Sequence, residues 1–250
     1  MRFLIGIDDT DNLTSGGTGN LCRQLGAKLA ELNLAEPIGI TRHQLFLSPE
    51  IPFTSHNSSA CIMVEIDIHK LEILASYCQE FLLTKSEPGS DVGLCLAQWD
   101  QVSTAVQTFG KQAKEKVLTQ EEAISLAQQA GLHLEGLTGT KDGIIGALAS
   151  VGLRKTENDG RFLWLPGLRD LEGVFTAQKL YQTATIDRIQ DLEGRLVPEN
   201  TKIQTSPWPR PVLLNGQAIL LVEKTNDEAH EIGEKDYEYQ IAPKSIIRQY

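Results

Sequence analysis

Three aspartates within four positions near the N-terminus are the residues of this sequence best suited to chemistry. Asp8, Asp9 and Asp11 follow a short apolar run, residues 2–7, which is typical of a buried strand. Crowded carboxylates resist ionising together unless a cation is near, and Mg²⁺ takes oxygen ligands alongside substrate phosphates. Along an extended chain Asp9 and Asp11 share one face, so three ligands on one ion require a bend at Thr10. The pattern predicts a Mg²⁺ site, with an exposed acidic turn as the alternative.

A glycine-rich turn follows the aspartates directly and opens a predicted helix. Glycines let backbone N–H groups turn toward an anion, and a helix N-terminus adds partial positive charge. We expect Thr18 to cap this helix. The candidate phosphate-binding residues are Thr10, Ser15, Gly16, Gly17, Thr18 and Gly19. Neither GxxxxGK[ST] nor GxGxxG is present, so a flexible surface loop is the alternative, although the adjoining aspartates favour phosphate binding.

A second loop, residues 136–143, combines glycines with a cation just before another predicted helix. Lys141 lies where the helix dipole disfavours a positive charge unless an anion is close. Lys141 and Gly143 are therefore further candidates for phosphate binding. The alternative is an exposed lysine paired with Asp142.

The elements that must position these residues follow the order βαββαβ, the split βαβ or ferredoxin-like pattern. Hydrophobic periodicity predicts strands at 2–7, 38–47, 60–68 and 92–97, and helices at 19–32 and 69–83. Residues 99–131 are predicted to be helical, with a capping box from Thr119 to Glu122, and residues 144–151 to form a buried helix. We therefore expect an α/β protein of the α+β type.

Beyond residue 155 the sequence changes to short strand-like pieces separated by Gly, Pro and Asn. This change predicts a catalytic domain at 1–155 and a smaller α+β or β-rich domain at 156–250. Within the second part, residues 206–211 (SPWPRP) are predicted to be a rigid connector rather than a peptide ligand. Arg154, Lys155, Arg161 and Arg169 form a small basic group that either steers an anion or is paired on the surface.

Composition excludes several classes of protein. The 250 residues carry 23 Lys and Arg against 33 Asp and Glu, which gives a formal net charge of −10. This charge argues against binding a polyanion mainly through the overall electrostatic field of the surface. Any nucleic-acid contact should be local, and the less acidic second half is the better place for it. No apolar run reaches the roughly 18 residues of a membrane span. The 4 cysteines form no CxxC pair, so we expect buried thiols in a cytoplasmic protein.

Six segments in collinear order carry a resemblance to a known family. They are residues 5–11 (IGIDDTD), 17–18 (GT), 48–53 (SPEIPF), 88–89 (PG), 121–127 (EEAISLA) and 141–152 (KDGIIGALASVG). Over about residues 1–155 the chain resembles the N-terminal catalytic region of the archaeal synthetases that attach agmatine to the wobble cytidine of an isoleucine tRNA. The resemblance implies ATP as cosubstrate, Asp8, Asp9 and Asp11 as Mg²⁺ and phosphate residues, and Thr18 as a participant in phosphate transfer.

The sequence also departs from that family. No CxxC pair is present for the family's zinc ribbon, and the family's Cys-Thr-Thr turn is Gly17-Thr18-Gly19 here. We therefore expect phosphoryl chemistry on a different acceptor. The leading hypothesis is an Mg²⁺- and ATP-dependent phosphoryl-transfer or ATP-activating enzyme. The alternatives are a tRNA- or nucleoside-modifying enzyme that works with an RNA-binding partner, and a nucleotide-binding protein without turnover.

Overall fold

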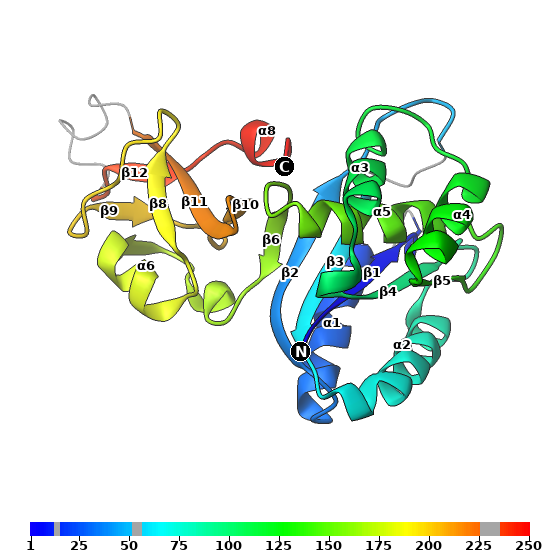
Figure 1. Ribbon diagram of the computed structural model, residues 1–250. Helices are drawn as coiled ribbons and strands as arrows, with labels where there is room; N and C mark the ends of the chain where they lie inside the picture. The colour runs from blue at the N-terminus through cyan, green and yellow to red at the C-terminus, as the bar shows by residue number, and fades with distance from the viewer. Residues whose placement is uncertain (13–15, 52–56, 226–235) are drawn as a thin grey trace. The chain divides into compact units, whose positions relative to one another are not determined.

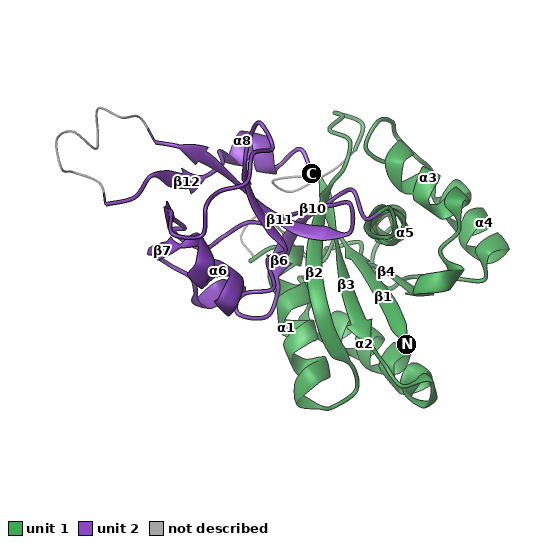
Figure 2. Ribbon diagram, turned by 60° about the vertical axis from the view of Figure 1, so that its left-hand side comes forward, with its two compact units in different colours: residues 1–156 green, residues 157–250 purple. Residues whose placement is uncertain are grey.

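The computed structural model describes residues 1–12, 16–51, 57–225 and 236–250 (Figure 1). The chain forms two compact units, residues 1–156 and residues 157–250 (Figure 2). Among the described residues, no helix combines the length and the apolar character needed to cross a bilayer.

Unit 1 is built on a five-stranded sheet whose neighbouring strands are all antiparallel. Its strands are β1 (Arg2–Asp8), β2 (Glu36–Gln44), β3 (Ser58–Glu65), β4 (Gly93–Gln98) and β5 (His133–Gly136), in the spatial order β5-β4-β1-β3-β2. Two helices complete the first part of the unit, α1 (Thr18–Glu31) and α2 (Leu71–Lys85). The order β1-α1-β2-β3-α2-β4 is the predicted one, which confirms the α+β class.

Helices cover both faces of the sheet (Figure 2). On one face, α1 packs on β2 and β3 because Leu21, Cys22, Leu25 and Leu29 recur on one side of it and are buried. On the other face lie α3 (Thr104–Gln112), α4 (Gln120–Ala130) and α5 (Gly143–Lys155), of which α5 contacts all five strands.

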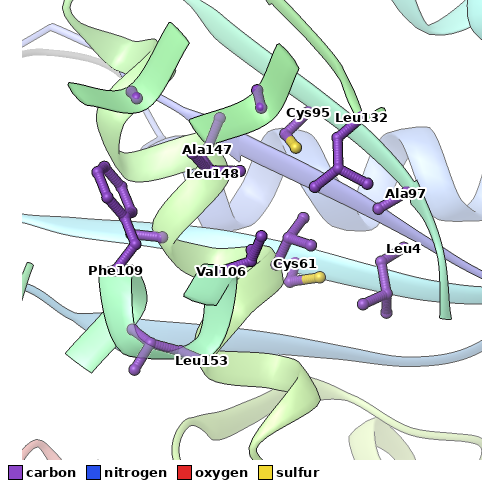
Figure 3. Close-up of a cluster of buried hydrophobic side chains, with 14 of the residues drawn as sticks. Leu4, Cys61, Cys95, Ala97, Val106, Phe109, Leu132, Ala147, Leu148 and Leu153 are labelled. Atoms are coloured by element: carbon purple, nitrogen blue, oxygen red, sulfur yellow. The ribbon is translucent and has the colours of Figure 1, made fainter. Parts of the chain in front are cut away.

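The core beneath α5 is close-packed (Figure 3). Leu4, Cys61 and Cys95 from three neighbouring strands meet Phe109 of α3 and Leu148 of α5. Here α5 approaches β1 so closely that a Cβ on Gly6 would lie 2.2 Å from the carbonyl oxygen of Ala147. The four cysteines are buried free thiols, as expected, and burial raises the pKa of Cys61 and of Cys78 to about 12.

Several predicted boundaries were wrong. Residues 99–131 form a short 3₁₀ turn, η2 (Trp99–Gln101), and two separate helices rather than one helical segment. The strand predicted at 60–68 ends at Glu65, because the Asp67 side chain accepts from the His69 amide and starts the 3₁₀ turn η1 (Ile68–Lys70). Strand β5 was not predicted, since its four residues have no clear alternation.

Unit 2 is a small mixed sheet with short helices. Its elements are β6 (Arg161–Trp164), η3 (Leu168–Asp170), β7 (Val174–Thr176), α6 (Ala177–Thr183), β8 (Arg188–Asp191), β9 (Lys202–Gln204), β10 (Val212–Leu214), β11 (Gln217–Lys224), β12 (Tyr239–Ile241) and α8 (Lys244–Ile247). The strand order is β6-β10-β11-β12-β9-β7, and β8 pairs parallel with β11. Alternate residues of β11 face two apolar clusters, and Ile247 of α8 belongs to the second, with Val212.

Candidate functional site

Five aspartates gather at one edge of the unit 1 sheet. Asp8, the last residue of β1, lies opposite Gly93, the first residue of β4. The segment that follows β1 therefore starts beside the segment that leads into β4. Helix α5 begins there too, because the Gly143 amide donates to the carbonyl oxygen of Asp91 over 2.9 Å. We call this set the acidic edge. It consists of Asp8, Asp9, Asp11, Asp91 and Asp142.

The Asp8 carboxylate lies against the first turn of α5. A Cβ placed on Gly146 would lie only 1.7 Å from Asp8 Oδ2, so the carboxylate fills the space that a side chain would need. Loss of hydration raises the pKa of Asp8 well above its usual range, and the Asp9 charge adds to the increase. A hydrogen bond from the Asp9 backbone amide and the positive charge of Arg42 lower this pKa and offset part of the increase.

Asp9 marks a sharp change in chain direction. Its φ of 52° is in the left-handed region, which is the bend that the spacing of the aspartates required, although at Asp9 rather than at Thr10. Loss of hydration and the Asp91 charge raise the pKa of Asp9 to about 6, with smaller contributions from Asp11 and Asp142. The backbone amide of Asp91 hydrogen-bonds this carboxylate and offsets part of the shift.

Thr18 does not cap α1, so that prediction was wrong. The N-cap is Gly17, and Thr18 is the first helical residue. Its buried hydroxyl accepts from the Thr10 amide over 3.3 Å, lies 3.1 Å from the Thr10 hydroxyl, and donates to Asp11 Oδ1 over 3.3 Å. The proton of Thr18 is therefore directed at a carboxylate.

A cavity of about 120 Å³ lies beside this hydroxyl. The residues that line it are Asp11, Gly17, Thr18, Gly19, Arg42, Ser58, Ser59 and Ala60. A water molecule takes about 30 Å³ and drug-sized ligands about 300 Å³ or more, so the cavity matches a phosphate group rather than a whole nucleotide. The N-terminus of α1 and the Arg42 guanidinium supply positive charge, and Ser58 and Ser59 add hydroxyl groups.

The carboxylates of the acidic edge do not meet at a single point. Within the described ranges, no group of three His, Cys, Asp or Glu side chains could hold a metal ion. The structure does not group the carboxylates of Asp8, Asp9 and Asp11 into one such set, and their binding of Mg²⁺ stays a prediction. The donor set still fits Mg²⁺, because this ion is commonly bound through one or two carboxylates with water and substrate phosphates completing its shell. Crowded carboxylates with raised pKa values also favour a nearby cation.

The second loop supports the acidic edge in a different way from the one expected. The Gly143 amide is already bonded to Asp91, so it does not point to a phosphate. Lys141 is exposed, with φ 70°, and within the described parts of the chain no ion pair joins it to Asp142. Instead, the Asp142 carboxylate accepts from Gln120 Nε2 over 2.5 Å and from the Thr140 hydroxyl over 2.7 Å.

Of the remaining candidates, Gly17 and Gly19 line the cavity. Gly16, which precedes Gly17, is exposed, and Ser15 lies outside the described residues. Asp91 is the site residue that sequence reasoning missed. A signal for it existed, because the predicted βαββαβ order places the start of the fourth strand beside the end of the first.

Comparisons with known proteins find similar structures over part of the chain. No protein-family model matches the chain. The structure of a tRNA fluorescent labeling enzyme is 26% identical with a TM-score of 0.53, and a complex of TiaS with an isoleucine tRNA and ATP is 26% identical with a TM-score of 0.54. Each match covers 61% of this chain and 36% of the other.

An uncharacterized protein of Methanocaldococcus jannaschii is 24% identical over 155 residues, which is 61% of this chain and 50% of that protein. The chain thus spans between about a third and a half of the length of the relatives it matches. The resemblance expected from the sequence motifs is confirmed: over 61% of its length the chain resembles TiaS, the agmatidine synthetase that acts on an isoleucine tRNA.

Proposed function

We propose that this protein is an Mg²⁺- and ATP-dependent enzyme that transfers or activates a phosphoryl group during the modification of an RNA or nucleoside. The observation that carries the proposal is the Thr18 hydroxyl, which is hydrogen-bonded to Asp11 in the lining of a phosphate-sized cavity. The likeness to a TiaS structure that holds tRNA and ATP supports the choice of substrates.

The cavity is suited to one phosphate of the nucleotide. Backbone groups at Gly17 and Gly19 and the N-terminus of α1 would face the anion, and Arg42 would neutralise part of its charge. Phosphoryl transfer needs mainly positioning and charge stabilisation, so this arrangement requires no unusual nucleophile.

The acidic edge is suited to the cation of the nucleotide. Asp11 lines the cavity and Asp9 precedes it by two residues, while Asp8 is held in place by its contact with α5. Asp9 and Asp11 would hold Mg²⁺, which would supply positive charge against the negative charge of the nucleotide. The backbone amide of Asp91 hydrogen-bonds the Asp9 carboxylate and would keep it in position for the cation.

Thr18 would position the transferred group or relay it. In a relay, the Oγ1–phosphorus bond forms while the bond from phosphorus to the leaving nucleotide oxygen breaks, and the hydroxyl proton passes to Asp11 Oδ1. The hydrogen bonds that Thr18 accepts from Thr10 leave its own proton directed at Asp11, which suits this transfer.

Calorimetric titration of the full chain with Mg–ATP tests the proposal. We expect saturable binding by the wild type and by the control Asp100→Asn, which removes an exposed carboxylate outside the acidic edge. Asp9→Asn should abolish it. Equal weak heats from all three proteins would contradict the proposal. Phosphorus NMR after long incubation then separates an enzyme from a nucleotide-binding protein, because only turnover yields ADP, AMP or pyrophosphate.

A mobility shift with bulk tRNA tests the RNA acceptor. Contacts with phosphates should weaken steeply as salt rises. Absence of a shift at low salt, with and without ATP, would favour a free nucleoside or another small acceptor.

A further inference from the structure

Unit 2 contains a cluster of arginines around one tryptophan that the proposed chemistry does not use. Arg169 Cζ lies 3.8 Å from the centroid of the Trp208 ring, and Arg210 Cζ lies 5.0 Å from the same centroid. The Arg169 guanidinium is also held by the Leu163 carbonyl, to which Nε and Nη2 donate over 3.3 and 3.1 Å. These contacts hold the indole against a guanidinium whose position is set by the backbone.

Arg248 is brought to the same place by the C-terminal helix α8. Ile247, the residue before it, packs in one apolar cluster with Val212, two residues after Arg210. Burial lowers the pKa of Arg210, and the charge of Arg248 lowers it further. Two guanidinium groups therefore lie close enough to repel each other. We call Arg169, Trp208, Arg210 and Arg248 the arginine–tryptophan cluster.

This arrangement differs from that of other cations in unit 2. Arg195 pairs with Asp191 over 2.7 Å, and Lys202 pairs with Asp236 over 2.6 Å. Over the part of the chain that the structure describes, no carboxylate pairs with Arg210 or Arg248. Like charges held together without a carboxylate are stabilised when an anion binds between them, and the guanidinium fork matches phosphate oxygens.

We propose that the arginine–tryptophan cluster binds the phosphate backbone of a single-stranded RNA segment. RNA is preferred over a lone phosphate because guanidinium planes stacked on an aromatic ring also provide surfaces on which bases stack. The choice of RNA rests on the proposed function of unit 1. Because the whole chain carries a net charge of −10, attraction must come from this local group, and binding should depend strongly on salt.

Fluorescence anisotropy with a labelled single-stranded RNA of mixed sequence tests the proposal on the full chain. Arg210→Gln and Arg248→Gln should each weaken binding about tenfold and lower the slope of log K against log salt by about 0.7 for each lost phosphate contact. The control Lys179→Gln removes one positive charge from an exposed position of α6 and should leave the slope unchanged. Circular dichroism and Mg–ATP titration should be the same for all three variants.

Three results would overturn the proposal. In the first, the two arginine variants bind RNA as the wild type does. In the second, Lys179→Gln weakens binding as much as they do, which would indicate attraction by positive charges spread over the surface rather than by the cluster. Inorganic phosphate at constant ionic strength could displace the RNA fully, which would indicate a site for a small anion. The wild type could also bind RNA in a way that depends on Arg210 and Arg248 and yet not bind Mg–ATP. That result would support this inference and would contradict only the proposed ATP chemistry.

Discussion

The Asp8 carboxylate occupies the space directly beside Gly146, where a Cβ would lie 1.7 Å from Oδ2. Asp8 ends the central strand β1, and Gly146 is in the first turn of α5, so the contact joins the sheet to the helix N-terminus. A carboxylate at this position gains from the partial positive charge of the helix. Close packing of α5 is therefore a condition for the geometry of the acidic edge.

Replacing this glycine should disable the site without unfolding the protein. In Gly146→Ala the new methyl group must displace Asp8, and we expect Mg–ATP affinity to fall at least about tenfold. Alanine is intrinsically better than glycine in a helix by about 1 kcal/mol, which offsets part of the steric cost. Calorimetry measures the affinity. Gly26→Ala is the control, since its closest contact would be the Ile40 side chain, at 3.2 Å. Unchanged affinity in Gly146→Ala would refute the role of Asp8.

The raised pKa of Asp9 predicts how stability depends on pH. Its value of about 6 in the folded protein is above the ordinary 3.8, so between these values the folded state binds more protons than the unfolded state. The free energy of unfolding should therefore fall as pH rises from about 4 to 6. Solvent screening of this half-exposed group limits the effect to on the order of 1 kcal/mol.

Urea denaturation at a series of pH values measures this dependence. Asp9→Asn should make the profile between pH 4 and 6 less steep, with the remaining slope due to Asp8, whose pKa is also raised. It should also stabilise the protein at neutral pH, because it removes a charge that its surroundings disfavour. Asp100→Asn should keep the wild-type profile. A wild-type profile that rises over this range would contradict the predicted sign.

The parts of the site that the sequence predicted are those encoded locally. Strand β1, the aspartates that follow it and helix α5 lie within continuous segments whose hydrophobic pattern is clear. The capping box of α4 is present as predicted, with Glu122 N donating to Thr119 Oγ1 and Thr119 N donating to Glu122 Oε2.

The parts that could not be predicted depend on contacts between distant segments. Asp91 reaches Asp9 through the pairing of β1 with β4, so the predicted strand order points to it but no local pattern does. Thr18 has the sequence position of a helix cap, yet its hydroxyl is drawn to Thr10 and Asp11 because the chain folds back at Asp9. Tertiary hydrogen bonds here outweighed a local capping preference.

The capping box of α4 should contribute to both stability and the site. Thr119→Ala leaves the Glu122 amide without its partner and should lower the free energy of unfolding by about 1 kcal/mol. For a chain of this size that is roughly 2–4 °C in Tm by thermal denaturation. Gln120, the next residue, holds Asp142, so Mg–ATP affinity should also fall modestly. Gln128→Ala, an exposed change in the same helix, is the control. Equal Tm values for the two variants would contradict the role of the cap.

The hydroxyl of Thr18 should separate nucleotide binding from turnover. Thr18→Ala removes the group that faces Asp11 and leaves the backbone of the α1 N-terminus in place, so Mg–ATP should still bind while product formation falls at least about a hundredfold. The buried Thr10 amide loses its acceptor, which should cost about 1–2 kcal/mol of stability. Thr18→Ser retains the hydroxyl and should recover most of both losses. Full activity of Thr18→Ala, measured by phosphorus NMR, would limit Thr18 to a structural role and require another acceptor for the phosphoryl group.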